Sequence, residues 1–481
     1  MFFTQLALTL PNKEANMSLI ILFILLLSYF LIATESFTKI NKSAVAIFAG
    51  TVCWVLYISY GSDFVTAFHG AEYSSFLAGK APSSSLVKQF IAQEVFIKYV
   101  GRACEIAAFL LATMTIVEIL SNNGCFDFIT QLLQTRKSRQ LLWIMSTVTL
   151  LISANLDNLT TSVMMLTMMH SVIPNRKQRM VFGAAIVLSA NYGGALTVIG
   201  EPISLVLWNM EAVTATGYSM SLLLPCLVAW AVTLWMIGRM LPERIDHERI
   251  VMPYRGDDTR LNTWQRLTML FVGFGGLWFI PSFHNITKLS PFLGALCVLS
   301  VLWIVDELMN HKLKNSDYMM MRRTPTALQY GTIQMILYVM GIMLVIGVVN
   351  ETGVVEWIAA KTNYTWLDNI CVVGSLTALM STVLDNFVTA MSIFSFSDVL
   401  TADGVEAITD VINSSAALDS PFWTRIVYAS VAGGNILCIG SLSGIALMKA
   451  ERIHVGWYFR HIGLKALVGG LLGAAVFFIV S

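Results

Sequence analysis

Long apolar segments alternate with short polar ones along this chain. Six apolar segments approach the ~20 residues that a helix needs to cross a bilayer; they are 18–34, 43–60, 103–120, 220–237, 331–349 and 463–480. Two others, 181–208 and 422–447, are apolar enough to cross but are interrupted by glycine-rich stretches. Two more, 140–173 and 370–396, each carry a polar phrase near the middle. The pattern predicts an all-α integral membrane protein.

The two polar phrases, SANLDNLTT and STVLDNFVT, share their polar positions. These positions are Ser153, Asp157, Asn158 and Thr161 in the first phrase, and Ser381, Asp385, Asn386 and Thr389 in the second. A charged side chain at membrane depth costs about 3 kcal/mol on insertion scales. A duplicated aspartate therefore predicts a buried functional site that two related halves of the chain share.

The composition supports the membrane class and narrows the set of partners. With 56% hydrophobic and 12% charged residues, the chain lacks the polar surface of a water-soluble globule. Its net charge of +1 gives no argument for a nucleic-acid partner. The seven cysteines are scattered without metal-ligand spacing. We therefore expect the lipid bilayer as the surroundings, no nucleic acid and no resident cofactor.

Basic residues cluster in short stretches, at 136–139, 176–179, 239–266, 312–323 and 449–465. The positive-inside rule places these stretches in the cytoplasm. Segment 140–173 has basic residues on both flanks, so it is expected to enter and leave on the cytoplasmic side. Its two arms would be about 24 and 21 Å long at 1.5 Å per residue, short of the ~30 Å of a full crossing. We predict a re-entrant hairpin with Asp157 and Asn158 at its tip.

Segment 370–396 has different flanks, because 350–368 is weakly charged and 397–421 is acidic and serine-rich. It is expected to be a hairpin that enters from outside, with Asp385 and Asn386 at its tip. Two hairpins with matching tips on opposite faces are what an inverted-topology repeat produces.

The repeat extends beyond the tips, because GGALTVIGEPISL, which begins at Gly193, matches GGNILCIGSLSGI, which begins at Gly433. We expect a first repeat at 1–240, a cytoplasmic linker at 241–266 and a second repeat at 267–481. Each repeat contains one re-entrant hairpin (140–173 or 370–396) and one broken helix (181–208 or 422–447). About ten transmembrane helices, two hairpins and two broken helices are expected in all.

The interruptions of the broken helices are candidate ligand sites. Glycine and Pro202 weaken the backbone hydrogen-bond ladder there, and such a break is tolerated at membrane depth only where it is buried in protein or lines a cavity. The nearby oxygen donors are Asn191, Glu201, Asn435 and Ser441. No Lys or Arg lies in the middle of these segments. Oxygen ligands without a cationic partner favour a hard cation over an anion.

Two simpler interpretations stay open at this point. Asp157 and Asp385 have the position of helix N-caps, where an aspartate accepts a backbone N–H. Capping and ion binding are compatible roles. Glu201 has two interpretations as well, a third ligand or proton site, or a solvated residue near the outer end of its helix.

The phrases LDNLTTSVMM and LDNFVTAMS, with SANYGGALTVIG and GSLSGIALM behind them, resemble NhaD-type sodium/proton antiporters of the ion-transporter superfamily. The resemblance covers the chain from about Ala103 onward. It implies a homodimer in the cytoplasmic membrane of a bacterium, with an elevator-like transport domain. The exchange of Na⁺ or Li⁺ for H⁺ would serve pH homeostasis.

Carried over by position, the family's site residues match Ser153, Asp157, Asn158, Thr160, Thr161, Asn191, Asp385, Asn386, Thr389 and Ser441. The chain departs from the family at Glu201-Pro202-Ile203, where the family often has Asp followed shortly by Thr residues.

Our hypothesis is a transporter, not an enzyme, in which Asp157 and Asp385 bind Na⁺ and H⁺ in competition, with Glu201 as a third candidate carboxylate. Burial favours the protonated form of a carboxyl group, so protons can compete with Na⁺ for the same oxygens. One alternative is a carboxylate or oxyanion symporter or exporter of the same superfamily. A remote alternative is an intramembrane aspartyl protease, but neither a Y-D nor a G-x-G-D motif surrounds the two aspartates.

Overall fold

A computed structural model describes residues 12–245, except 127, 130–132, 134 and 136, together with 261–310, 330–355, 370–401 and 418–480. Every regular element in these ranges is a helix, apart from one isolated bridge between Lys137 and Arg244. The predicted all-α fold is confirmed. Most of the expected linker at 241–266 lies outside the described residues.

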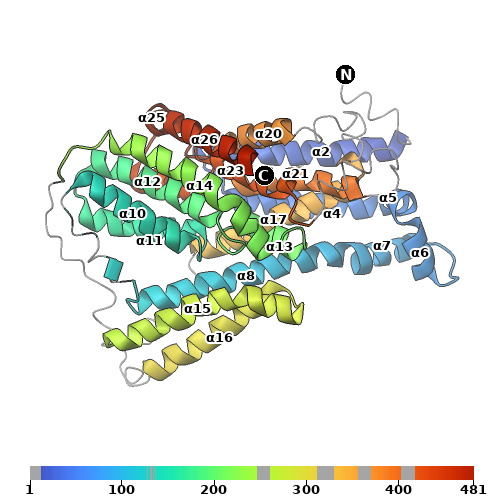
Figure 1. Cartoon of the computed structure of the whole chain (residues 1–481). Helices are drawn as coiled ribbons and strands as arrows, with labels where there is room; N and C mark the ends of the chain where they lie inside the picture. Colours follow the sequence, from blue (N-terminus) through green and yellow to red (C-terminus); the bar gives the residue numbers. More distant parts are fainter. Residues whose placement is uncertain are drawn as a thin grey trace. The chain divides into compact units, whose positions relative to one another are not determined.

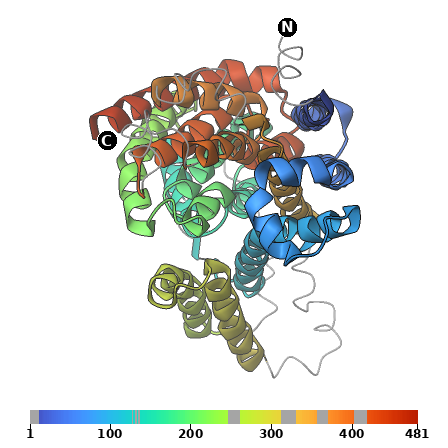
Figure 2. The same ribbon diagram turned by 90° about the vertical axis from the view of Figure 1, so that its right-hand side faces the viewer.

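The six uninterrupted apolar segments all form helices (Figure 1). They are α2 (Asn12–Ala33), α4 (Lys42–Ser59), α8 (Ile97–Asn122), α14 (Ala215–Gly238), α17 (Tyr330–Glu351) and α26 (Leu464–Val480). Two further apolar helices, α15 (Thr263–Thr287) and α16 (Pro291–Met309), form an antiparallel pair (Figure 2). Within the described residues, seven helices are long and apolar enough to cross a membrane. The chain is therefore a multi-pass membrane protein.

Shorter helices connect or extend the long ones. They are α3 (Glu35–Thr38), α5 (Gly61–Phe68), α6 (Gly70–Leu77), α7 (Ser84–Phe90), the π-helix η1 (Ile91–Phe96), α25 (Val455–Tyr458) and the π-helix η6 (Phe459–Gly463). Helix α8 continues η1 without interruption, and α26 continues η6.

The helices stop at the predicted tips and interruptions. The first tip, residues 154–157, separates α10 (Ser138–Ser153) from α11 (Asn158–Val172). The second tip, residues 384–385, separates α20 (Ile370–Val383) from α21 (Asn386–Thr401). The first break, residues 195–201, divides α12 (Arg176–Gly194) from α13 (Pro202–Asn209). The second break, residues 435–441, divides α23 (Pro421–Gly434) from α24 (Leu442–Glu451). Pro202 suits the first turn of α13, where no intrahelical N–H is needed.

The chain forms two compact units that interleave along the sequence. The first unit comprises 1–107, 333–372 and 391–414, and the second comprises 108–332, 373–390 and 415–481. Every candidate ion-binding residue predicted from the sequence falls in the second unit. The division into repeats at 1–240 and 267–481 stays a prediction.

A partly buried carboxylate joins four segments of the first unit. The Glu351 carboxylate, at the end of α17, accepts hydrogen bonds from Tyr99 Oη at 2.8 Å and Tyr57 Oη at 3.4 Å. His69 Nε2 lies 2.6 Å from Glu351 Oε2, and His69 Nδ1 lies 3.1 Å from Glu72 Oε2. The hydrogen bond to Glu351 raises the pKa of His69 above its ordinary value, against an opposing effect of partial burial.

This contact predicts that the first unit loses stability as pH rises. A raised histidine pKa means that the stabilisation is fully present below the unfolded value of about 6.5 and is lost as pH rises through the folded value. His69→Gln should remove this dependence. Melting temperatures of detergent-purified protein over a pH series test it, with His284→Gln as a control because His284 Nδ1 contacts a carbonyl, Leu289 O, at 2.7 Å. A gap between wild type and His69→Gln that stays constant with pH would contradict the prediction.

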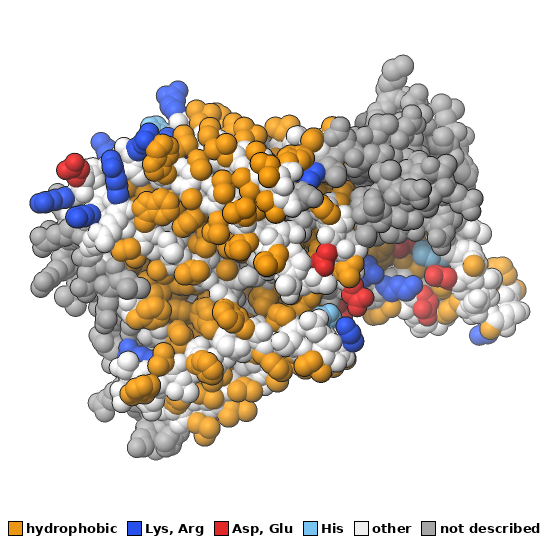
Figure 3. Space-filling view, in the orientation of Figure 1, with side chains coloured by type: hydrophobic (Ala, Val, Ile, Leu, Met, Phe, Trp, Pro, Cys, Tyr) orange, Lys and Arg blue, Asp and Glu red, His pale blue; other side chains and the backbone are white. Residues whose placement is uncertain are grey.

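The outer surface of the second unit is suited to lipid. Leu223 and Leu224 on α14 and Leu471 and Leu472 on α26 are exposed. Hydrophobic side chains cover much of the described surface in the region where α14 and α26 lie (Figure 3). Lys and Arg side chains gather at the end of this unit where α25 lies (Figure 3). We name this end, which includes the first turn of α12 and the last turn of α24, the basic end.

Candidate functional site

Asp157 forms the start of helix α11. Its backbone is extended, and its Oδ1 accepts a hydrogen bond from Thr160 N at 2.8 Å, so it is the N-cap of the helix. Its Oδ2 is buried and has no hydrogen-bond partner among the described residues. The side chain is only 3% exposed. One carboxylate oxygen thus caps the helix, and the other is available to a ligand.

Asp385 has the equivalent place before α21. Its Oδ1 accepts a hydrogen bond from Phe387 N at 3.0 Å, and the residue is 2% exposed. The following Asn386 donates its backbone N–H to Gly440 O in the second break at 3.2 Å. The second tip is therefore bound directly to the interruption of its own broken helix.

Glu201 is the point where the two tips meet. Its Oε1 accepts hydrogen bonds from Asn158 Nδ2 at 2.7 Å and from Asn386 Nδ2 at 3.4 Å. Glu201 is 1% exposed, and its Oε2 has no hydrogen-bond partner among the described residues. The open choice between a solvated and a buried glutamate is therefore decided in favour of burial. One carboxylate oxygen receives the matching asparagine from each hairpin.

Asn191 connects the two broken helices. From the last turn of α12 its Nδ2 donates to Asn435 Oδ1 at 2.8 Å and to Ser441 Oγ at 3.0 Å. Ser441 is the N-cap of α24 and accepts Gly444 N at 3.1 Å. Ser443 Oγ in turn donates to Asn158 O at 3.0 Å. The polar residues of both breaks and the first tip thus form one hydrogen-bonded network.

Ser153 and Ser381 hold the hairpins on the broken helices. Ser153 Oγ donates to Ala190 O at 2.6 Å, and Ser381 Oγ donates to Ser430 O at 2.6 Å. These are corresponding contacts in the two matched sequence segments. Both hydroxyl hydrogens are used in fixing the hairpins to the broken helices, so these serines position the tips.

The same close packing occurs twice between glycine and a hairpin arm. A Cβ at Gly193 would lie 2.9 Å from Leu150 Cα, and a Cβ at Gly433 would lie 2.8 Å from Ala378 Cα. Real side chains do not approach backbone so closely. Glycine at these two positions therefore allows each broken helix to touch the first arm of its hairpin.

Thr161 and Thr389, one turn into α11 and α21, differ from other buried threonines. Thr149 and Thr377 each donate to the carbonyl four residues earlier at 2.7 Å. The hydroxyls of Thr161 and Thr389 are buried without a hydrogen-bond partner among the described residues. A buried polar group without a partner costs about 1–3 kcal/mol, so these matched hydroxyls are candidate ligands.

The candidate site is rich in oxygen donors, and its charged side chains are acidic. Basic residues of the broken helices lie only near their ends, at Arg176, Lys177 and Arg179 in α12, Arg425 in α23 and Lys449 in α24. The Arg425 guanidinium lies over the rings of Phe477 and Phe478, at 5.1 and 4.5 Å from their centroids. The arrangement of three carboxylates with hydroxyl and amide groups is suited to a hard cation or a proton.

Sequence reasoning identified the polar residues of this network but not its connections. The convergence of Asn158 and Asn386 on Glu201 and the glycine contacts with the hairpin arms were not predicted. A cluster around Glu451 at the basic end was missed as well. Its only sequence signal is a glutamate at the end of an apolar segment, next to Arg452.

Comparison with known proteins assigns the chain to a group of transporters. A family model described as "Citrate transporter" (CitMHS) matches residues 19–321. A protein named Sodium/proton antiporter 1 from Arabidopsis thaliana is 30% identical over 78% of this chain, which spans 62% of that relative's length. Sodium/proton antiporter 2 from the same plant is 28% identical over 78% of this chain and 85% of its own length.

Bacterial relatives carry the same kind of name as the plant relatives. A protein named Na(+)/H(+) antiporter NhaD from Vibrio parahaemolyticus is 22% identical over 72% of this chain and 83% of its own length. The resemblance to NhaD-type antiporters that the two tips indicate is therefore confirmed.

Proposed function

This chain belongs to the citrate transporter family, and we propose that it is a secondary transporter that exchanges Na⁺ or Li⁺ for protons. The observation that carries this proposal is the convergence of both tip asparagines on Glu201 Oε1. Among the described residues, Asp157 Oδ2, Glu201 Oε2 and the Thr161 and Thr389 hydroxyls are also buried without hydrogen-bond partners. The names of the plant and bacterial relatives support the same ions.

In the proposed mechanism Asp157 and Asp385 bind either Na⁺ or a proton. Asp157 uses Oδ1 to cap its helix and leaves Oδ2 for the ligand. Asp385 Oδ1 accepts the backbone N–H of Phe387 at the start of α21. A buried carboxylate needs a counter-charge, which Na⁺ or a proton supplies. Competition for the same oxygens then couples the two opposite fluxes without a separate proton pathway.

The two hairpins would provide alternating access. An inverted repeat gives the site one hairpin from each side of the membrane, with repeats at 1–240 and 267–481 around the linker 241–266. We propose a homodimer with an elevator-like transport domain, as the family resemblance implies. A bacterial cytoplasmic membrane stays a prediction for the location, because the relatives include both bacterial and plant proteins.

The main rival is transport of a carboxylate or oxyanion, which the family's description suggests. An anion in the buried site would face Asp157, Asp385 and Glu201, and like charges in a low-dielectric site repel strongly. The basic residues at the ends of the broken helices lie outside the network of the tips and breaks. The relatives' names also favour transport over the protease alternative.

Everted vesicles from a host without its own sodium/proton antiporters test the proposal. Addition of Na⁺ or Li⁺ to respiring vesicles should collapse the acid-inside pH gradient, read with a fluorescent dye. Uptake of labelled citrate should equal that of vesicles without the protein. Citrate uptake in the absence of any cation-dependent proton flux would establish the rival.

Replacing Glu201 with glutamine tests the third carboxylate. A glutamine Oε1 can still accept from Asn158 and Asn386, so the tips keep their positions while one charge is lost. We expect the apparent KM for Na⁺ to rise about tenfold, the equivalent of about 1.4 kcal/mol, with normal folding. Glu211→Gln is the control, because Glu211 is exposed beyond the end of α13. An unchanged KM and pH profile would remove Glu201 from the ion site.

A further inference from the structure

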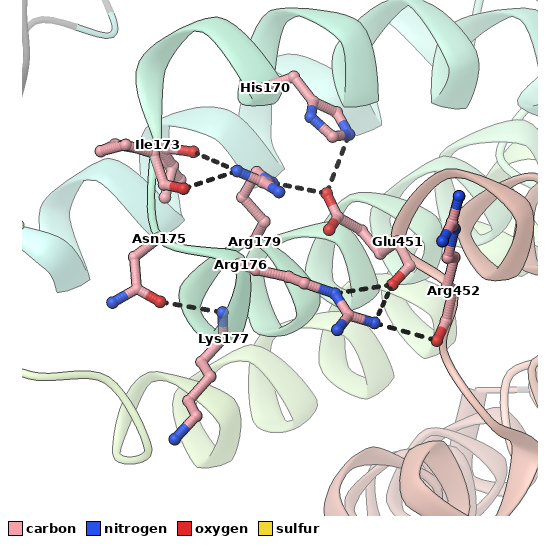
Figure 4. Close-up of polar contacts among 9 residues, drawn as sticks. His170, Ile173, Asn175, Arg176, Lys177, Arg179, Glu451 and Arg452 are labelled. Atoms are coloured by element: carbon pink, nitrogen blue, oxygen red, sulfur yellow. Dashed lines mark hydrogen bonds and ion pairs between the residues drawn. The ribbon is translucent and has the colours of Figure 1, made fainter.

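Another buried carboxylate, outside the candidate ion site, lies at the basic end, where the helices that form the site have their opposite ends. Glu451 is the last residue of α24, and its side chain is 1% exposed. Its Oε1 lies 2.8 Å from Arg179 Nε and 2.9 Å from His170 Nε2 (Figure 4). This cluster is not part of the proposed ion site.

The cluster joins three elements that each contribute to the ion site at their other ends. Arg179 Nη1 donates to Pro174 O at 2.7 Å. Arg176 Nη2 donates to Glu451 O at 2.8 Å (Figure 4). Helix α11 begins beside Asp157, α12 carries Asn191 in its last turn, and α24 begins after Ser441. A change in the cluster therefore acts on helices whose far ends hold the ion ligands.

His170 is the histidine of the cluster. Histidine is the side chain whose ordinary titration falls between about pH 5 and 8. The His170 side chain is 40% exposed, so it can exchange protons with water. Arginine stays charged throughout this range, and Arg179 therefore keeps its pair with Glu451 at any such pH.

On α10, α12 and α24, the helices that pack against α11, the charged side chains at this end are basic apart from Glu451. The charged residues at this end of the packed elements are Lys137 and Arg139 at the start of α10, Arg176, Lys177 and Arg179 on α12, and Lys449, Glu451 and Arg452 at the end of α24. A protonated His170 is attracted across the interface of α11 and α24 by the one carboxylate in this described group. A neutral His170 loses that attraction.

We propose that His170, Arg179 and Glu451 form a pH-responsive latch between α11 and α24 that sets the pH dependence of transport. Protonated His170 holds the two helices together at the basic end and slows the change of access, while neutral His170 releases them. This inference rests on the proposed antiport function. The latch would regulate antiport from the basic end, which the positive-inside rule assigns to the cytoplasm.

The test is the pH profile of Na⁺-dependent proton flux for wild type, His170→Gln and His461→Gln. His461 is a matched control at the same end, because its Nδ1 contacts a carbonyl, Trp457 O, rather than an acid. We expect the flux of His170→Gln to exceed that of wild type by about threefold at about pH 6 and to equal it at about pH 8, since a partly exposed ion pair contributes only a small free energy. His461→Gln should follow wild type. Coincident profiles for wild type and His170→Gln would overturn the latch.

A charge-retaining variant and a transport-independent measurement complete the test. His170→Lys keeps a positive charge, so it should show the slow acid-side rate at both pH values. Hydrogen–deuterium exchange of purified protein, corrected for intrinsic pH effects, should show faster opening of 165–179 and 445–452 at about pH 8 than at about pH 6. In His170→Gln the corrected rates should not depend on pH. Absence of antiport in every variant would refute the proposed function, while a pH-independent exchange in wild type would refute the latch itself.

Discussion

Replacing either tip aspartate with asparagine should abolish Na⁺-dependent proton flux. Asparagine keeps the size of the side chain and an oxygen that can cap the helix, as Asp157 does through its hydrogen bond from Thr160 N. It removes the negative charge that a desolvated Na⁺ requires. Loss of one charged partner in a buried site costs about 3–5 kcal/mol, which corresponds to at least a 100-fold weaker apparent affinity for Na⁺. We expect both Asp157→Asn and Asp385→Asn to match vesicles without the protein.

The control for this prediction is an aspartate outside the spans. Asp63 lies in the first turn of α5, where Ser62 Oγ donates to its Oδ1 at 3.1 Å. Asp63→Asn should retain the wild-type flux. If Asp157→Asn or Asp385→Asn kept full flux in correctly folded protein, that aspartate would be an N-cap alone.

Adding a single methyl group at Gly193 or Gly433 should prevent correct assembly of the site. The new Cβ would press on the backbone of Leu150 or Ala378, which has no flexible end that can move away. Overpacking of a core usually costs about 1–3 kcal/mol, and more where backbone must shift. We expect Gly193→Ala and Gly433→Ala to give little monodisperse protein in detergent and a clear fall in melting temperature.

Gly101 provides a matched control, because it lies inside α8 and a Cβ there meets nothing within 4 Å. Alanine is favoured over glycine in a helix by about 1 kcal/mol, so Gly101→Ala should leave melting unchanged or raise it. Equal behaviour of Gly193→Ala and Gly101→Ala in a size-exclusion and melting assay would show that the close contact of α12 with α10 is not required.

The local features of the site could be predicted from sequence because each has a local cause. Asp157 starts a helix by accepting a nearby backbone N–H, and Pro202 fits only the first turn of α13. The tips and breaks therefore fall where the polar phrases and glycines indicated. The length of each hairpin arm, 16 and 15 residues for α10 and α11, follows from the distance between basic flanks and tip.

The connections between distant segments could not be predicted in the same way. Nothing in the sequence near Glu201 indicates that Asn386 donates to it. Nor does the sequence near Asn191 indicate Asn435 as its acceptor. Such contacts depend on how whole helices pack, and helical periodicity specifies a face rather than a partner atom. For the same reason the ion pair of Glu451 with Arg179 was not expected.

The structure also shows what Glu201 does at the position where the chain departs from the family pattern. Glu201 and Ser441 are corresponding residues of the matched segments, and both precede a helix with nearly the same backbone angles, φ −140° and ψ 149° against φ −143° and ψ 151°. Ser441 caps its helix, whereas the Glu201 side chain makes no cap and instead receives the two tips. The two matched segments therefore have the same backbone conformation at this position, but only the first contributes a carboxylate there.

The most direct test of the central claim is the release of protons when Na⁺ binds to purified protein in weakly buffered detergent solution. Competition for the same carboxylates predicts that Na⁺ displaces protons, and that the apparent affinity for Na⁺ weakens by up to about tenfold for each pH unit of acidification per competing proton. Asp157→Asn and Asp385→Asn should release none. Saturable Na⁺ binding without proton release, at an affinity that does not change with pH, would contradict the account.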